Sequence, residues 1–166
     1  MLIRRLAVVL GILFLVPSVA RADGHRAGLG GGISFARGSW LTGGHFLFEH
    51  VVPTGAERYL YVTADYSFHD GDGFKRQIFL AGANVTGSWK NVAATGRLVV
   101  GSVWGDGSAD LSWSYGAAID IVPGENSPLR QRSYYLTPRV QVDHIIRKGS
   151  PEGFARVSID LVVKFP

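Results

Sequence analysis

The 166-residue chain contains no cysteine. Disulfides, thiolate metal sites and thiol catalysis are therefore excluded. A chain of this size can fold on its core alone, so the lack of disulfides does not argue against export. Helical periodicity is almost absent after residue 22, and no apolar run there approaches the roughly 20 residues that a spanning helix needs. Any contact with a membrane would have to use strands.

The N-terminus has the layout of a secretory signal peptide. Arg4 and Arg5 precede the apolar run 6–16, and Ala20-Arg21-Ala22 forms a small-x-small cleavage site before Asp23. This predicts a cleaved signal at 1–22 and one domain at 23–166. Without the three arginines of the signal, Lys+Arg falls from 17 to 14 against 13 Asp+Glu, a net charge of +1. No basic stripe remains, so we expect no nucleic-acid partner.

Alternation of apolar and polar residues is the dominant pattern, and the C-terminal stretch 154–165 shows it most clearly. Its apolar positions are Val157, Ile159, Leu161, Val163 and Phe165, and its polar positions include Arg156, Ser158, Asp160 and Lys164. Successive side chains of a strand point to opposite faces, so this is a strand with one apolar and one charged face.

Turn signals cut the rest of the chain into similar pieces. With 22 glycines in the sequence, the pattern predicts eight strands, at 27–35, 40–50, 58–68, 75–88, 92–104, 110–121, 132–146 and 154–165. Their short connections imply an antiparallel meander. The first strand is rich in glycine and weak by propensity. Pro138 lies inside the seventh strand, where a residue without an N–H predicts a bulge or a local break.

Two architectures fit such strands. In a soluble barrel or sandwich the apolar faces point inward, whereas in an outer-membrane barrel they meet lipid and the polar faces line the interior. The expected strand length, about 10–13 residues, and polar faces rich in Gly, Ser and Thr favour an all-β, antiparallel, up-and-down transmembrane β-barrel of about eight strands. Aromatic residues gather near the strand ends, as in a membrane girdle: Trp40, Phe68, Trp89, Trp104, Trp113 and Phe165.

The charged residues on the polar faces would then project inward. They are Asp65, Arg97, Asp120, Arg139, Asp143, Arg156, Asp160 and Lys164, with Asp110 and Glu49 as further candidates. An unpaired ion in a narrow interior is costly, so we expect Arg97, Arg139 and Arg156 to meet aspartates, in particular Asp65, Asp143 and Asp160. Eight strands leave an interior that side chains fill, which favours a structural interior over a conducting pore.

The segments YLYVTADYSFHDG, LTPRVQVDHI and FARVSIDLVVKF resemble the small outer-membrane β-barrel proteins of the OmpA/OmpX-like family, over about residues 58–165. The positions that match the family pattern are Asp65, Arg139, Gln141, Asp143, Arg156, Ser158 and Phe165. The resemblance implies an outer-membrane location and assembly by outer-membrane machinery that reads the C-terminal strand. The chain departs from the pattern at His144, Asp160 and Pro166, the last of which follows the terminal aromatic residue.

No catalytic or metal-binding motif stands out. The five histidines lack metal-ligand spacing, and the stretch 69–73 is expected to be a solvated hairpin tip rather than a calcium loop. There is no G-x-S-x-G motif, and His144 and Asp143 are strand neighbours that point to opposite faces. We therefore expect no enzyme activity, no metal and no cofactor.

The leading hypothesis is a monomeric outer-membrane barrel of structural or narrow-pore (porin-like) type, embedded in outer-membrane lipid. Its N-terminus and the turns near 51–57, 89–91 and 122–129 would face the periplasm of a Gram-negative cell. The turns near 36–39, 69–74, 105–109 and 147–153 would face outward and are short. One alternative is a soluble, exported lipocalin-like barrel that binds an apolar ligand, and a second is an outer-membrane lipid-modifying enzyme.

Overall fold

The computed structural model describes residues 24–52, 59–71, 74–105, 108–123, 127–128, 133–147 and 150–165. The predicted signal peptide, most of the predicted turn at 51–57 and half of the predicted turn at 122–129 lie outside this described part. Eight strands make up the fold: β1 His25–Ala36, β2 Ser39–Val52, β3 Tyr59–Gly71, β4 Phe74–Trp89, β5 Val92–Gly105, β6 Ser108–Ile121, β7 Tyr134–Arg147 and β8 Ser150–Phe165. No helix among the described residues is long and apolar enough to cross a membrane.

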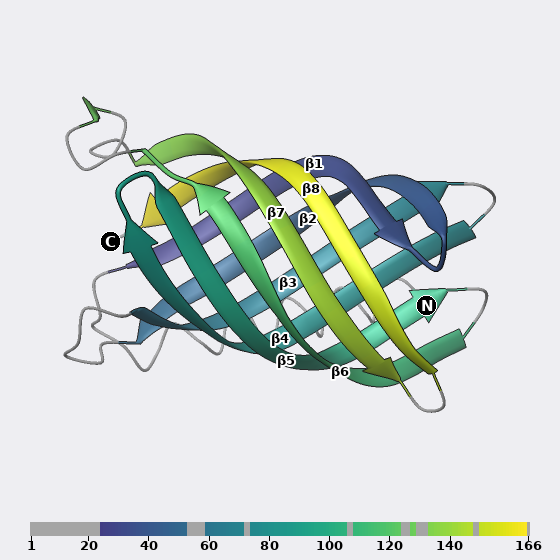
Figure 1. Cartoon of the computed structure of the whole chain (residues 1–166). Coiled ribbons are helices and arrows are strands. Elements are labelled where there is room, and N and C mark those ends of the chain that lie inside the picture. Colours follow the sequence, from purple (N-terminus) through teal and green to yellow (C-terminus); the bar gives the residue numbers. More distant parts are fainter. Residues whose placement is uncertain are drawn as a thin grey trace.

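The strands form a closed antiparallel barrel in the order in which they occur in the sequence. Figure 1 shows them strongly tilted around a central axis, with β8 beside β1. That pairing runs from His25↔Phe165 to Ala36↔Phe154 without interruption. The fold class and the meander predicted from the sequence are thus confirmed, and the glycine-rich first strand does close the barrel.

The strands are between 12 and 16 residues long, and most of them extend beyond the predicted limits, although β3 and β7 begin later than predicted, at Tyr59 and Tyr134. The largest correction concerns the last hairpin, because β8 begins at Ser150 rather than at Phe154, so residues 150–153, which the sequence predicts as part of a turn, belong to the strand. One end of the barrel, where β1 begins and β8 finishes, is called the termini end below. The opposite end, with the β1–β2, β3–β4, β5–β6 and β7–β8 connections, is called the far end.

Each of the four far-end connections contains two residues, namely 37–38, 72–73, 106–107 and 148–149. The first is formed by Arg37 and Gly38, both with positive φ (51° and 79°). A two-residue turn with positive φ at both positions matches the twist of the flanking strands. At the termini end, Lys90 and Asn91 join β4 to β5, whereas the other two connections, 53–58 and 122–133, are longer.

Pro138 produces no bulge, but one of the two ladders of β7 stops beside it, which is the local break that the sequence predicts as the alternative. β7 stays in continuous register with β8 through the pair Pro138↔Ile159. The ladder between β6 and β7, however, ends one residue earlier, at Asp120↔Arg139. At this point the hydroxyl of Thr137 replaces the missing backbone donor, and its Oγ1 donates to the carbonyl oxygen of Ile121 at 2.7 Å. A side-chain hydroxyl therefore satisfies the acceptor that proline, which has no N–H, cannot reach.

The faces of the strands are sorted as in a membrane barrel. Along β8, Val157, Ile159 and Leu161 are exposed, while Arg156 and Asp160 are buried. The other strands follow the same rule, with Leu98, Leu111, Ile119 and Leu136 among the exposed apolar side chains. The outer surface is thus apolar and the interior is mainly polar, the reverse of a soluble barrel.

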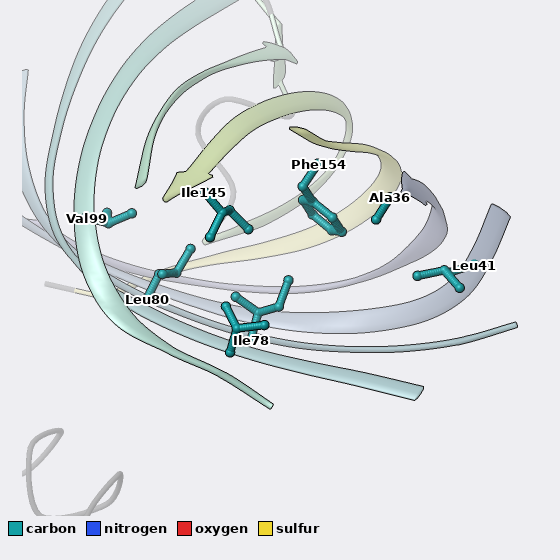
Figure 2. Close-up of a cluster of buried hydrophobic side chains, with 8 residues drawn as sticks. Ala36, Leu41, Ile78, Leu80, Val99, Ile145 and Phe154 are labelled. Carbon is teal, nitrogen blue, oxygen red and sulfur yellow. The ribbon is translucent and has the colours of Figure 1, made fainter. Parts of the chain in front are cut away.

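Part of the interior is nevertheless apolar. Toward the far end, eight buried side chains form a hydrophobic cluster (Figure 2): Ala36, Leu41, Ile78, Leu80, Val99, Val103, Ile145 and Phe154. The cluster draws on residues close to the β1–β2 and β7–β8 turns, so it fills the barrel beneath those connections. Polar and charged groups occupy the interior between this cluster and the termini end.

Candidate functional site

Five polar side chains form a closed circuit across the barrel, here called the central ring: Asp65, Arg97, Asp143, Gln141 and Arg156. Asp65 Oδ2 lies 3.2 Å from Arg97 Nη1 and 3.2 Å from Arg156 Nη2. Arg97 Nε lies 3.4 Å from Asp143 Oδ1, and Gln141 donates to Asp143 Oδ2 at 2.5 Å. Arg156 Nη2 donates to Gln141 Oε1 at 2.8 Å, which closes the circuit.

The central ring connects strands that lie far apart around the barrel. Asp65 comes from β3, Arg97 from β5, Gln141 and Asp143 from β7, and Arg156 from β8. All five side chains are buried. Two guanidinium groups and two carboxylates balance in charge, as burial of ions requires. The ring therefore braces opposite walls of the barrel and obstructs the interior.

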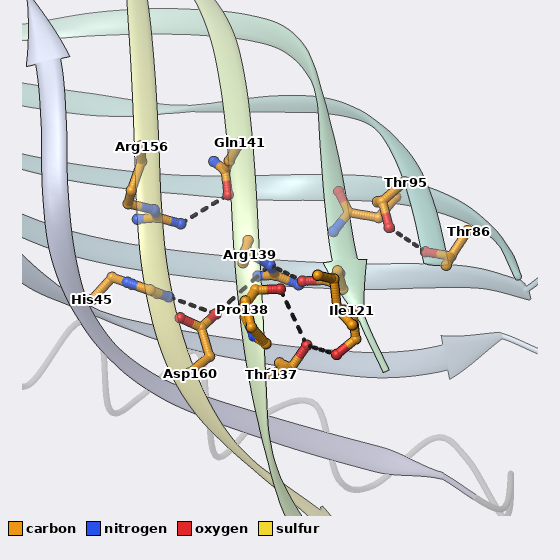
Figure 3. A network of polar contacts seen from close by, with 12 residues as sticks. His45, Thr86, Thr95, Ile121, Thr137, Pro138, Arg139, Gln141, Arg156 and Asp160 are labelled. Atoms are coloured by element: carbon orange, nitrogen blue, oxygen red, sulfur yellow. Dashed lines mark hydrogen bonds and ion pairs between the residues drawn. The ribbon is translucent and has the colours of Figure 1, made fainter. Parts of the chain in front are cut away.

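A second set of contacts is centred on Arg139 (Figure 3). Its guanidinium holds Asp120 through two bonds, Nε to Oδ1 at 2.6 Å and Nη2 to Oδ2 at 3.0 Å. Asp160 Oδ2 lies 3.7 Å from Arg139 Nε and 3.1 Å from His45 Nε2. The two-bond arrangement is the geometry in which arginine binds a carboxylate most strongly. Strand pairing brings Asp120 and Arg139 together, since they are register partners.

Two further clusters lie toward the barrel ends. Near the termini end, Glu49 pairs with Arg26 and accepts a bond from Asn84 Nδ2 at 2.9 Å. Arg26 also lies over the ring of Tyr61, 4.3 Å from its centroid. Near the far end, Glu152 is surrounded by three arginines. Its partners are Arg37 at 2.9 Å, Arg147 at 3.6 Å and Arg76.

The remaining predicted interior charges lie at the edges of these networks. Asp110 is half-buried and lies 3.6 Å from Arg147. Lys164 lies near the termini end with its Nζ 5.1 Å from the centroid of the Tyr135 ring. Lys164, which the sequence predicts among the interior charges, is thus not a member of the central ring.

The predicted girdle residues separate into two groups by register. Trp40, Phe68, Trp104 and Trp113 lie toward the far end, and Trp89 and Phe165 lie at the termini end. Trp104 is half-buried and the other five are exposed, with Trp89 the most exposed at 71%. Rings that flank an apolar band at both ends match the interfaces of a bilayer, where aromatic side chains are enriched.

Sequence reasoning missed Glu152 and His45. Glu152 shares the inward face of β8 with Arg156, but Pro151 and the turn residues around it suggested that the strand had not yet begun. His45 has no metal-ligand spacing in the sequence, yet its side chain is buried against Asp160. A strand started at Ser150 and a consistent alternation rule along β2 would have placed both side chains inside.

One serine and one histidine of the interior are close enough to form a hydrogen bond. Ser34 Oγ and His69 Nδ1 are 2.9 Å apart, but both residues are buried inside the barrel, away from its lipid-type surface. Within the described ranges, no three His, Asp or Glu side chains stand together in a way that could hold a metal ion. The most extensive polar contacts in the described interior are those of the charge networks.

Comparison with known proteins gives information on the fold alone. No family model matches the chain, and no curated protein matches it. Among solved structures, the crystal structure of Neisserial surface protein A is similar with a TM-score of 0.55 at 12% identity, covering 86% of this chain and 96% of that one.

Two other solved structures are similar at lower scores. The crystal structure of Ail, the attachment invasion locus protein of Yersinia pestis, has a TM-score of 0.49 at 11% identity and covers 84% of this chain and 97% of that one. The outer membrane enzyme PagL has a TM-score of 0.44 at 11% identity, covering 82% and 98%. By its eight-stranded meander and its likeness to Neisserial surface protein A, the chain has the fold of the small outer-membrane β-barrel proteins, as its sequence resemblance implied.

Proposed function

We propose that the chain is exported, processed after Ala22 and inserted into the outer membrane as a monomeric barrel whose role is structural rather than conducting or catalytic. The observation that carries this proposal is the inverted sorting of the faces. Apolar side chains such as Ile159 and Leu111 cover the outside, and paired charges fill the inside. An interior filled with ions instead of apolar side chains is physically reasonable only if the apolar outer face contacts lipid rather than water.

The alternative of a soluble lipocalin-like carrier is less favoured, because of both its outer surface and its cavities. A carrier of apolar ligands needs an apolar cavity, and its outer surface must meet water. Here the interior cavity among Arg26, Glu49, Asp120 and Arg139 measures about 10 Å³, roughly the space of one water molecule. A larger cavity of about 350 Å³ lies at the termini end, and two charged side chains, Arg26 and Lys164, are part of its lining. The small interior volume and the charged linings both oppose a buried apolar ligand.

The side chains that fill the interior also support a barrel that is closed to ions. The central ring joins β3, β5, β7 and β8, and the hydrophobic cluster lies between it and the far end. An ion that crossed the barrel would have to displace both layers. We therefore favour a sealed barrel over the narrow pore. The lipid-modifying enzyme is also less favoured, because the Ser34–His69 pair is buried in the interior.

Partners follow from the same proposal. The surrounding lipid is the main one, and outer-membrane assembly machinery would read β8, which ends in an exposed aromatic residue, Phe165. The barrel closes on itself through β1 and β8, so it has no free strand edge that would require a second copy.

The test combines extraction and conductance. We expect the mature protein to require detergent for extraction and to migrate differently on a gel before and after boiling. In planar bilayers it should give no single-channel steps. Asp65→Ala removes the shared partner of Arg97 and Arg156, and it should weaken the barrel without creating a stable pore. Solubility in plain buffer would overturn the membrane assignment, and steady conductance by the unaltered protein would overturn the sealed interior.

A further inference from the structure

Two cationic side chains lie side by side in the mouth of the barrel at the termini end. Arg26 of β1 and Lys164 of β8 are register partners, and the alternation of their strands directs both side chains inward. Like charges directly opposite each other destabilise a pair of strands. Glu49, the register partner of Arg26 on β2, offsets one of the two charges. The proposed structural role gives no reason for placing a second cation beside the first.

A tyrosine ring lies against each of these cations. The guanidinium carbon of Arg26 is 4.3 Å from the centroid of the Tyr61 ring, and Lys164 Nζ is 5.1 Å from the centroid of the Tyr135 ring. Both tyrosines are buried. Cation–π contacts at such distances hold a cationic group in place without neutralising it. The two cation–tyrosine pairs therefore keep their positive charge where an anion can contact it.

These four side chains line one cavity, which has a volume of about 350 Å³ and is here called the mouth cavity. That volume is at the lower end of the range for small-molecule sites, about 300–1,000 Å³. The other described residues of its lining are Gly24, His25, Val51 and Phe165. No carboxylate is among the described lining residues, and the cations stand beside aromatic and apolar groups. Such a lining suits a small organic anion rather than a neutral apolar molecule.

The contact with Glu49 leaves part of the hydrogen-bonding capacity of Arg26 unused. Arg26 Nε donates to Glu49 Oε2, whereas Arg26 Nη2 has no acceptor among the described residues. The second oxygen of Glu49 is already committed, because it accepts a hydrogen bond from Asn84 Nδ2 at 2.9 Å. A guanidinium group with an unused donor is costly when it is buried, so an additional acceptor at this end of the barrel would be stabilising.

The mouth cavity belongs to the interior of the barrel rather than to its lipid-facing wall, because the two cations and the two tyrosines face inward. In the proposed orientation, small molecules would enter it from the periplasm. The next cavity inward shares Arg26 and Tyr135 with it and measures only about 10 Å³. A ligand that enters the mouth therefore stops there, and the barrel can bind it without conducting it.

We propose that the mouth cavity binds a small organic anion, a carboxylate with a flat aromatic body. Its carboxylate contacts the Arg26 and Lys164 side chains, since charge-assisted hydrogen bonds are the strongest that these groups form. Its body lies among the rings of Tyr61, Tyr135 and Phe165. This site goes beyond the proposed structural role, and only its position on the periplasmic side rests on the proposed orientation.

The test uses the folded protein in a non-ionic detergent, with empty micelles as the blank and the gel shift on boiling as the measure of folding. The probe is fluorobenzoate, and its binding is followed by fluorine NMR. Two further probes separate its parts: fluorobenzyl alcohol has the ring without the charge, and fluoroacetate has the charge without the ring. Each should bind about tenfold more weakly than fluorobenzoate, the usual effect of losing one charged hydrogen bond or one buried ring.

Variants of one lysine test the cationic part of the site. Lys164→Gln should lower the affinity for fluorobenzoate about tenfold, and Lys164→Arg, which keeps the charge, should retain most of it. Lys90→Gln is the matched control. Lys90 lies in the β4–β5 turn at the same end, with its Nζ 4.8 Å from the centroid of the Trp89 ring, and it is not part of the cavity lining. Its loss removes the same charge and should change the affinity less than about twofold, because exposed charges are screened.

The outcomes are separable. Equal binding of fluorobenzoate and fluorobenzyl alcohol would overturn the cationic site, and this comparison needs no variant to fold. Equal losses for Lys164→Gln and Lys90→Gln would do the same, and equal binding of fluoroacetate would overturn the aromatic part. A heat-modifiable barrel that binds no fluorobenzoate up to its solubility limit overturns the site and leaves the proposed function intact. A protein that binds the probe but is soluble in plain buffer overturns the proposed function and leaves the site intact.

Discussion

The glycines of β1 show how a single residue sets what the interior can hold. Gly30 faces inward at the height of the His45–Asp160 contact. A Cβ there would lie 2.2 Å from Asp160 Oδ1 and 2.5 Å from His45 Cε1. Glycine lowers the β propensity of the strand at this position, but it leaves the space in which the His45 and Asp160 side chains contact each other.

Gly30→Ala should accordingly lower the free energy of unfolding by about 1–3 kcal/mol, the usual range for overpacking. Gly31→Ala is the matched control, because Gly31 faces outward and its Cβ would meet nothing closer than 3.7 Å. The control should change the free energy by less than about 0.5 kcal/mol. Equilibrium unfolding of both variants from lipid vesicles measures the difference, and equal effects would contradict this account of β1.

The outer face gives a second prediction for single residues. Ile159 is 62% exposed and lies near the middle of β8. Replacement by arginine should cost about 2–4 kcal/mol if this face meets the bilayer midplane. Leu111 is 80% exposed but lies close to the β5–β6 turn, so Leu111→Arg should cost at most about 1 kcal/mol. In plain water neither change would be costly, and equal effects at the two positions would argue against contact with lipid.

At the scale of the element, β7 remains a strand despite its proline. Thr137 replaces the missing donor by bonding the carbonyl oxygen of Ile121. Thr137→Val keeps the shape and removes this bond, so the barrel should lose about 1–3 kcal/mol of stability. Thr63→Val is the control, because the buried Thr63 hydroxyl has no hydrogen-bond partner among the described residues. It should be neutral or slightly stabilising, and a loss equal to that of Thr137→Val would contradict the role given to Thr137.

The strands and their two faces could be predicted from the sequence, whereas the individual ion pairs between strands could not. Alternation needs only the order of residues, so the two faces of β6 and β8 could be assigned without a structure. Ion pairs also need register and closure. Asp120 meets Arg139 because two strands pair with that offset, and Asp65 meets Arg156 only across the closed barrel. Glu152 could not be placed in the interior from the sequence, because Pro151 beside it is a turn signal. Pairing with β7 nevertheless makes both residues part of β8.

For the whole molecule, the unequal ends predict an orientation. If both termini face the periplasm, the two-residue far-end turns face the cell exterior. The absence of cysteine makes this testable with single thiols. A bulky maleimide should label Lys75→Cys, at the far end, in intact cells. It should label Asn91→Cys, at the termini end, only after the outer membrane is permeabilised. The reverse pattern would invert the proposed topology.

The two-residue turns also bear on the order of folding. Each of the four far-end hairpins joins residues that are close in sequence, so its closure costs little chain entropy. The pairing of β1 with β8 instead joins the two ends of the domain. Non-local contacts of this kind are slow to form, and here one partner is a glycine-rich strand with weak intrinsic preference. We therefore expect hairpins to assemble first and the β1–β8 seam to set the rate at which the barrel closes.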